Sequence, residues 1–332
     1  MWRFEGEGEA MLYVPLGTTN LRVSALCLGT WALGGDWGRV DEDQAHATVG
    51  HALDTGINFF DTAQAYGFGL SERVLADALW DRVQRDAVVV ATKGGLRRDG
   101  DRLVRDASAA WLREGVEASL RNLRTDYIDI YQVHWPDAAT PAEETGAALT
   151  ELVREGKIRH VGVSNHGVAE LEALRPFTAL ETLQPPYHLF RRGIEADILP
   201  YCAAHGMGVM VYGPLAHGLL SGAMTAATTF AADDWRSHSR DFSGERFTRN
   251  LAVVDQLRGF AAERGMSLVE LAVAWTLSHP AVDCAIVGAR RPDQLSGSIG
   301  AADVKLTEED RALIDHIAAG AVPQHGATPE GM

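Results

Sequence analysis

Short runs of apolar residues alternate along this chain with longer segments whose apolar positions recur at helical spacing. The first pattern is typical of buried parallel strands, and the second is typical of helices that cover them. Gly and Pro residues separate many of these segments, as expected of short connections. Strands are predicted at 25–28, 58–61, 87–92, 128–133, 159–164, 180–184, 208–212 and 283–287.

Each predicted strand is followed by at least one predicted helix. Gly56 ends the first of these helices, and Ser71 is expected to begin the second. A long irregular insert, 213–249, separates the seventh strand from the helices after it. Helices are predicted at 41–55, 71–80, 108–122, 141–154, 168–174, 194–205, 251–264, 267–278, 291–300 and 307–318.

Eight strand–helix units with short connections favour a parallel sheet. Eight units also favour closure into a (β/α)8 TIM barrel over an open doubly wound sheet. The dinucleotide fingerprint GxGxxG does not follow the first strand, which argues against the open alternative. Segment 11–23 carries a weak hairpin signal. Because no linker interrupts the alternation, residues 1–332 are predicted to form a single domain.

The composition of the chain excludes some classes of function and leaves the predicted fold unchanged. The net charge is −15, which argues against nucleic acid or an anionic membrane as a partner. No apolar run approaches the ~18 residues of a membrane span, and segment 1–10 lacks the pattern of a signal peptide. The three cysteines lie far apart, as expected of reduced thiols in a cytoplasmic protein.

Four titratable side chains stand at or just after the ends of predicted strands. They are Asp61, Tyr66, Lys93 and His134. Because parallel strands of a barrel all end on one face, these side chains are expected to share a site. Each of them taken alone could have a purely structural role. The Asp could cap a turn, the Tyr could lie in a loop, the Lys could be solvated at the end of a strand, and the His could be a hydrogen-bonded core residue. Their coincidence favours a shared chemistry.

Seven long segments occur in order along the chain: GINFFDTAQAYG, VVVATKGG, YIDIYQVHWPD, GKIRHVGVSN, LQPPYHLFRR, YGPLAHGLLSG and IVGARRPDQL. With them the chain resembles the aldo-keto reductases over nearly its whole length. GTWALGG, AYGFGLSE and VHWPD together resemble the bacterial stress-associated branch of that family. The resemblance implies a barrel whose lower end is plugged by the hairpin, with extra helices after the seventh and eighth strands and NAD(P)H bound across the top.

The resemblance implies reduction of aldehydes and ketones to alcohols, with the roles of the four side chains as follows. Tyr66 is the general acid, and Lys93 the cation that makes its hydroxyl a better acid. Asp61 pairs with Lys93 and holds it in place. His134, as a neutral imidazole, orients the substrate carbonyl. Small aldehydes, dicarbonyls and aldoses are the expected substrates.

The resemblance also implies the cofactor contacts. Tyr212 is expected to stack on the nicotinamide ring, while the small residues after it offer backbone N–H groups to the pyrophosphate. Arg290 or Arg291 would pair with a 2′-phosphate, which favours NADPH over NADH. The expected cofactor set is Gly29, Thr30, Trp31, Asp61, Ser164, Asn165, Gln184, Tyr212, Gly213, Pro214, Leu215, Gly218, Ser221, Gly288, Arg290, Gln294 and Ser298.

The substrate pocket is expected where strand ends meet loops. Trp31 and Trp135 should wall its mouth, beside Tyr66 and His134, and the 213–249 insert and the C-terminal tail are expected at the outer rim. The histidines show no metal-ligand spacing, so no metal is expected. Loops set specificity on this fold, so the physiological substrate stays open, as does the oligomeric state.

Two other functions remain open from the sequence. A Schiff-base aldolase would use Lys93 as its nucleophile, and borohydride would trap its adduct with a keto substrate. A cofactor-binding redox sensor with slow turnover is the non-enzyme alternative, because the family includes channel-associated members. The intact set of four side chains favours the reductase.

Overall fold

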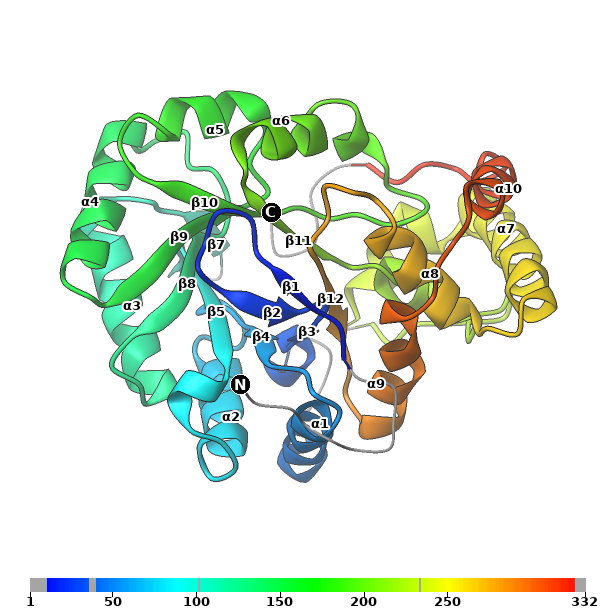
Figure 1. Cartoon of the computed structure of the whole chain (residues 1–332), viewed down its shortest axis with the longest axis horizontal. Coiled ribbons are helices and arrows are strands. Elements are labelled where there is room, and N and C mark those ends of the chain that lie inside the picture. The colour runs from blue at the N-terminus through cyan, green and yellow to red at the C-terminus, as the bar shows by residue number, and fades with distance from the viewer. Residues whose placement is uncertain (1–10, 36–39, 101, 233, 326–332) are drawn as a thin grey trace.

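The computed structural model describes residues 11–35, 40–100, 102–232 and 234–325 (Figure 1). The acidic segment 1–10 and the tail residues 326–332 lie outside this part of the chain. No helix within the described ranges is long and apolar enough to cross a membrane.

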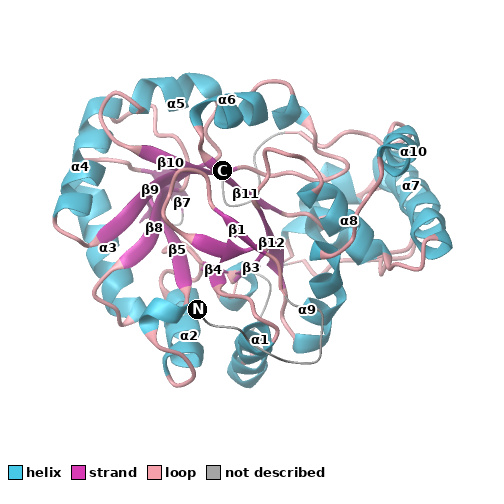
Figure 2. Cartoon of the chain, in the orientation of Figure 1, coloured by secondary structure: helices cyan, strands magenta, loops and turns pink. Residues whose placement is uncertain are grey.

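Eight parallel strands close into a barrel, so the predicted fold class is confirmed (Figure 2). Around the barrel the order is β10, β11, β12, β3, β4, β5, β8 and β9. Neighbouring strands of the described chain follow one another in sequence except β5 and β8, and except β12 and β3, where the barrel closes. The barrel strands are β3 (Leu26–Gly29), β4 (Phe59–Asp61), β5 (Val89–Gly94), β8 (Ile128–Val133), β9 (Ile158–Ser164), β10 (Leu180–Gln184), β11 (Gly208–Tyr212) and β12 (Cys284–Gly288).

Helices surround the barrel (Figure 1). Both α7 and α8 lie between β11 and β12, and α10 follows α9 after the last strand. The expected extra helices after the seventh and eighth strands are therefore present. The helices are α1 (Glu42–Asp54), α2 (Leu70–Trp80), α3 (Ala109–Leu123), α4 (Ala142–Arg154), α5 (Val168–Leu174), α6 (Ile198–His205), α7 (Gly244–Glu263), α8 (Leu268–Leu277), α9 (Pro292–Ile299) and α10 (Glu308–Ala318).

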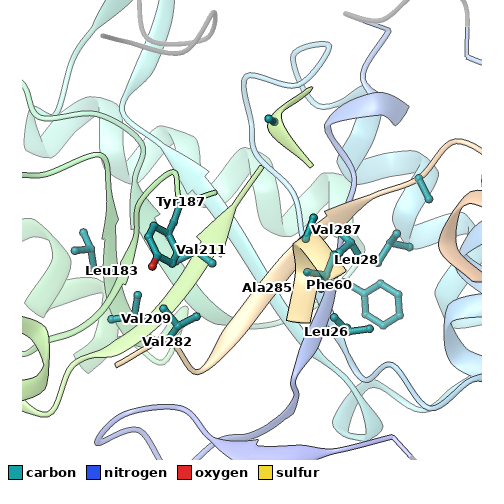
Figure 3. Close-up of a cluster of buried hydrophobic side chains, with 14 of the residues drawn as sticks. Leu26, Leu28, Phe60, Leu183, Tyr187, Val209, Val211, Val282, Ala285 and Val287 are labelled. Atoms are coloured by element: carbon teal, nitrogen blue, oxygen red, sulfur yellow. The ribbon is translucent and has the colours of Figure 1, made fainter. Parts of the chain in front are cut away.

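Side chains that alternate along the strands build two apolar layers. Leu26 and Leu28 belong to the larger cluster between strands and helices, part of which is drawn in Figure 3. Cys27, between them, belongs to a smaller cluster that fills the barrel together with Phe59 and Met210. The period of two is what a strand requires when both of its faces are buried. All three cysteines are buried and free.

A hairpin closes the lower end of the barrel. It consists of β1 (Tyr13–Pro15) and β2 (Arg22–Ser24), drawn in dark blue in Figure 1. Leu16 and Val23 from this hairpin join the cluster inside the barrel. The strands therefore end on the opposite face, which is left for a site.

Several local features differ from the predictions. A second hairpin, β6 (Leu96–Asp99) paired with β7 (Arg102–Arg105), lies between β5 and α3, where neither a strand nor a helix was predicted. Helix α6 begins at Ile198, four residues after its predicted start at 194. Helix α7 begins at Gly244, seven residues before its predicted start at 251. Ser71 does not begin α2, because Gly69 is the N-cap and the Ser71 hydroxyl donates instead to the Thr30 carbonyl at 2.8 Å.

Candidate active site

Three of the four titratable side chains leave adjacent strands of the barrel. Asp61 ends β4, Lys93 lies in β5, and His134 directly follows β8. These strands are neighbours in the order β4, β5, β8. Tyr66 lies in the loop between β4 and α2. All four therefore lie at the end of the barrel that the β1–β2 hairpin leaves open.

The ammonium group of Lys93 is the centre of this cluster. It donates to Asp61 Oδ2 at 2.6 Å, to the Thr62 carbonyl at 2.9 Å and to the Tyr66 hydroxyl oxygen at 3.2 Å. Lys93 has 1% of its surface exposed and Asp61 has 2%. A buried charge is tolerated only when it is paired and hydrogen-bonded. Three acceptors match the three N–H groups of an ammonium ion, so this cation is fully satisfied.

Two amides hold the other oxygen of Asp61. Gln184 Nε2 donates to Asp61 Oδ1 at 2.8 Å, and Gln132 Nε2 donates to it at 3.3 Å. Gln184 was expected to bind a cofactor amide, whereas Gln132 was missed. With Lys93 on one oxygen and amides on the other, the carboxylate has a fixed orientation.

His134 packs beside the tyrosine. The two ring centroids lie 5.9 Å apart, with the planes at 81°. Burial lowers the pKa of His134 well below its ordinary value, and the nearby charge of Lys93 lowers it further. The imidazole is therefore neutral near pH 7. Its Nδ1 atom is buried and has no hydrogen-bond partner among the described residues.

A cavity of about 700 Å³ opens beside this cluster. Asp61 and Tyr66 lie in its wall, together with Trp31, whose ring stacks against that of Tyr66 at a centroid distance of 6.1 Å. From there the wall continues along the ends of β11 and β12 and into the loops that follow them. The cavity therefore runs from the buried lysine cluster towards the last two strands of the barrel.

A model of the Aldo/keto reductase family matches residues 25–319. The chain belongs to this family. Among its relatives, the aldo-keto reductase YhdN of Bacillus subtilis (strain 168) is 43% identical over 309 residues, which cover 92% of this chain and 93% of that protein. The NADH-specific methylglyoxal reductase of Escherichia coli (strain K12) is 35% identical, over 93% of this chain and 98% of that protein.

Solved structures agree with this assignment. The structure of the glycerol dehydrogenase AKR11B4 from Gluconobacter oxydans is 41% identical, with a TM-score of 0.87 over 96% of this chain and 98% of that one. Aldo-keto reductase AKR11C1 from Bacillus halodurans, in a holo form, has 31% identity and a TM-score of 0.78, over 94% of this chain and 98% of that one. The chain is thus an oxidoreductase of a family that uses nicotinamide cofactors and acts on small carbonyl compounds.

Most residues expected to contact the family's cofactor line the larger cavity. Three do not: Ser164 and Ser298 are buried elsewhere in the fold, and Asn165 lines a second, separate cavity. The residues that do line the larger cavity are Gly29, Thr30, Trp31, Asp61, Gln184, Tyr212, Gly213, Pro214, Leu215, Gly218, Ser221, Gly288, Arg290 and Gln294.

Asn165 and Ser164 nonetheless connect to the site. The hydroxyl of Tyr212 donates to Asn165 Oδ1 at 2.8 Å, and Asn165 Nδ2 donates to the His134 carbonyl at 3.1 Å. The Ser164 hydroxyl donates to the Gln184 carbonyl at 2.8 Å. These bonds join the ends of β8, β9, β10 and β11.

The 213–249 insert supplies wall residues that the sequence did not single out. Met224, Asp234 and Arg236 line the cavity, as does Phe230, which was expected at the rim. Trp235 packs edge-on against His217, at a centroid distance of 4.9 Å. Trp135, expected at the substrate mouth, lines the second cavity instead.

No group of three or more His, Cys, Asp or Glu residues in the described part of the chain is placed to hold a metal ion.

Proposed function

We propose that this chain reduces aldehydes and ketones with NADPH, and that Tyr66 donates the proton that completes the alcohol. The observation that carries the proposal is the buried Lys93 ammonium group, which lies between the Asp61 carboxylate and the Tyr66 hydroxyl. The reduced nicotinamide, when bound, supplies a hydride to the substrate carbon. The carbonyl oxygen then needs a proton, which a positioned acid delivers faster than water.

The direction of the hydrogen bonds supports Tyr66 as this acid. Its oxygen accepts from the Lys93 ammonium group at 3.2 Å, so its own hydrogen can point to another acceptor. In the proposed step that acceptor is the substrate oxygen. The phenolate that remains is stabilised by the adjacent cation. Asp61 and the Thr62 carbonyl keep the cation in this position throughout.

His134 is proposed to orient the substrate carbonyl. A buried N–H without an acceptor is costlier than a buried lone pair, so the partnerless Nδ1 is best assigned as the lone pair of the neutral ring. The hydrogen is then on Nε2. With the pKa lowered by burial and by Lys93, the ring remains a neutral donor. A neutral N–H polarises a carbonyl without competing with Tyr66 as the proton source.

The larger cavity fits an extended dinucleotide. Its wall includes Tyr212, an aromatic surface for a nicotinamide ring. At Gly213 and Gly288 a Cβ atom would meet nothing within 4 Å, so the backbone there can be approached closely by a ligand. Arg290 lines the cavity and Arg291 does not, although both side chains are exposed. Arg290 is therefore the better candidate for a 2′-phosphate contact.

The reaction is tested by following loss of the reduced nicotinamide with a panel of aldehydes, ketones and dicarbonyls. Turnover with NADPH and no adduct after borohydride treatment would support a hydride-transfer reductase. A borohydride-trapped adduct on Lys93 would instead identify an aldolase. Tight NADPH binding with negligible turnover on the whole panel would contradict an active reductase.

The cofactor preference is tested at Arg290. We expect Arg290→Ala to raise the KM for NADPH roughly tenfold, as the loss of one charged hydrogen bond implies, and to change the KM for NADH little. Arg291→Ala is the matched control, because that neighbouring arginine lies outside the cavity wall. Equal KM values for NADPH and NADH in the unaltered protein would contradict a phosphate clamp.

A further inference from the structure

Three buried threonines lie next to residues of the candidate active site in the chain. One of them lies in β5, and the other two directly follow β3 and β4. All three have an exposed fraction of 0%, and each hydroxyl group contacts the first turn of helix α2. The helix therefore holds the ends of three barrel strands beside the site. Thr30 precedes Trp31, Thr62 follows Asp61, and Thr92 precedes Lys93.

The hydroxyl group of Ser71 connects two of these threonines. It donates to the Thr30 carbonyl at 2.8 Å and accepts from the Thr62 hydroxyl at 3.0 Å. The Thr30 hydroxyl in turn donates to the Asp61 carbonyl at 3.0 Å. Ser71 is fully buried, and it is not the N-cap of α2. Its side chain therefore joins the ends of β3 and β4 to the helix.

Ser71 also lies close to both members of the proposed pair of acid and cation. Its backbone N–H donates to the Tyr66 carbonyl at 3.2 Å. Its side-chain partner Thr62 carries the carbonyl that accepts from the Lys93 ammonium group at 2.9 Å. Ser71 is thus bonded directly to Tyr66, and it is connected to Lys93 through one intervening residue.

Glu72, the residue after Ser71, holds the third threonine. The Thr92 hydroxyl donates to Glu72 Oε1 at 2.7 Å, and Asn122 Nδ2 donates to Glu72 Oε2 at 2.9 Å. The carboxyl group is fully buried. A buried polar group of this kind contributes little to stability, because its desolvation offsets much of what its hydrogen bonds supply. Its bonds do fix the position of Thr92, and with it the backbone that carries Lys93.

The contact between Lys93 and Tyr66 is the one most easily lost from the cluster. Lys93 Nζ lies 2.6 Å from Asp61 Oδ2 but 3.2 Å from the Tyr66 hydroxyl oxygen. Hydrogen bonds from nitrogen to oxygen extend to about 3.2 Å. Because this contact is already at the limit, moving the ammonium group by roughly 0.5 Å away from Tyr66 would break it. The ion pair with Asp61 can survive the same movement.

We infer that Ser71 and Glu72 are positioning residues for the Lys93 ammonium group. Through the threonines that they bind, they hold this group within hydrogen-bonding distance of the Tyr66 hydroxyl. Neither residue lies in the wall of the larger or the second cavity. The inference rests on the proposed reductase activity, in which this contact makes Tyr66 the proton donor.

Ser71→Ala tests the first of the two residues. We expect kcat for a small aldehyde to fall roughly tenfold, while the Kd for NADPH stays unchanged. The loss of kcat/KM at alkaline pH should occur about one pH unit higher, because the displaced cation favours the phenolate of Tyr66 less. A merely structural role of Ser71 would lower the melting temperature and leave this pH profile in place.

A pair of variants at Thr92 tests Glu72 without removing the buried carboxyl group. Thr92→Val removes the hydroxyl group with little change of shape and should move the pH profile in the same direction, whereas Thr92→Ser should keep the unaltered profile. Thr276→Val is the matched control, because that buried hydroxyl donates to the Ala272 carbonyl at 2.9 Å within helix α8. A pH profile that is the same in Ser71→Ala, Thr92→Val and this control would overturn the inference.

Failure of the reductase proposal would be recognised separately. In that case the unaltered protein would turn over no carbonyl compound, and crystal structures of the unaltered protein and of Ser71→Ala would test the positioning alone. A distance above ~3.5 Å between Lys93 Nζ and the Tyr66 hydroxyl oxygen in the variant would support the inference. A contact between these two atoms that is the same in both proteins would refute it.

Discussion

Lys93 connects the chemistry of this molecule to its stability. Its ammonium group has three acceptors, and one of them, Asp61, is a buried carboxylate. Removing one partner of a buried ion pair costs about 3–5 kcal/mol, because the other charge is left uncompensated. The same group is proposed to stabilise the Tyr66 phenolate. Loss of the lysine should therefore affect both folding and catalysis.

Lys93→Met should lower the free energy of unfolding by about 3–5 kcal/mol and lower kcat by roughly 10²–10⁴-fold. Chemical denaturation and steady-state kinetics measure the two effects. The double variant Asp61→Asn with Lys93→Met removes both charges and should recover much of the stability, but none of the activity. Activity that returns together with stability would show that Lys93 has only a structural role.

At the residue scale, much of the site could be predicted from the sequence. Asp61, Lys93 and His134 stand at the ends of recognisable strands, so their common face follows from barrel geometry alone. Gln132 was missed because it lies within β8, where a polar residue in a buried strand has no distinctive pattern. Trp135 was expected at the mouth of the substrate pocket but lines the second cavity. The sequence could not predict this, because the direction of a side chain after a strand depends on the conformation of the loop.

Two elements show where the pattern of apolar residues stops being informative. The β6–β7 hairpin has four arginines and one aspartate among the eight residues of its strands, and so offers no alternation of apolar and polar positions. Its turn signal is Gly100, which follows Asp99, the residue that pairs with Arg102. The insert after β11 contains short 3-10 turns such as Ala216–Ser221, which have no period long enough to recognise.

The β1–β2 hairpin gives a prediction at the scale of elements. A Cβ at Gly17 would lie 2.1 Å from the backbone nitrogen of Gly208, the first residue of β11. Gly17→Ala should therefore push the hairpin away from the barrel and lower stability by about 2–4 kcal/mol, from overpacking together with a φ of +50°. Thermal denaturation followed by circular dichroism measures the loss.

Gly156→Ala is the matched control for this substitution. Its φ is +75°, and nothing lies within 4 Å of the added Cβ. The free energy of unfolding of this variant should fall by only ~1 kcal/mol, because the substitution adds backbone strain and no close contact. Equal losses for the two variants would show that close contact between hairpin and barrel contributes nothing.

At the scale of the whole molecule, buried histidines predict sensitivity to acid. The pKa values of His134 and His188 lie well below the ordinary value, and burial lowers that of His217 to about 4. Between the unfolded pKa of ~6.5 and these folded values, the unfolded chain binds more protons than the folded one. Stability is therefore lost as the pH falls from ~6.5 towards 4, by up to about 1.4 kcal/mol per pH unit for each histidine.

His217→Asn isolates one of these contributions. His217 has a φ of +54°, a conformation that asparagine tolerates better than most residues. Between pH 6.5 and 4, the unfolding free energy of the variant should fall less steeply with decreasing pH. The slope should be smaller by up to about 1.4 kcal/mol per pH unit, the contribution of one bound proton. Urea denaturation at a series of pH values measures this slope. A slope identical to that of the unaltered protein would mean that His217 takes up its proton in the folded state as readily as in the unfolded one.

Tyr66→Phe tests the central claim most directly. The substitution keeps the ring that packs against Trp31 and His134, and removes only the hydroxyl that accepts from Lys93. Turnover of a small aldehyde and equilibrium binding of NADPH are measured on the same preparation. We predict a fall in kcat of at least roughly 100-fold, with the Kd for NADPH unchanged. A Tyr66→Phe protein that reduces the aldehyde at the unaltered rate would contradict the account.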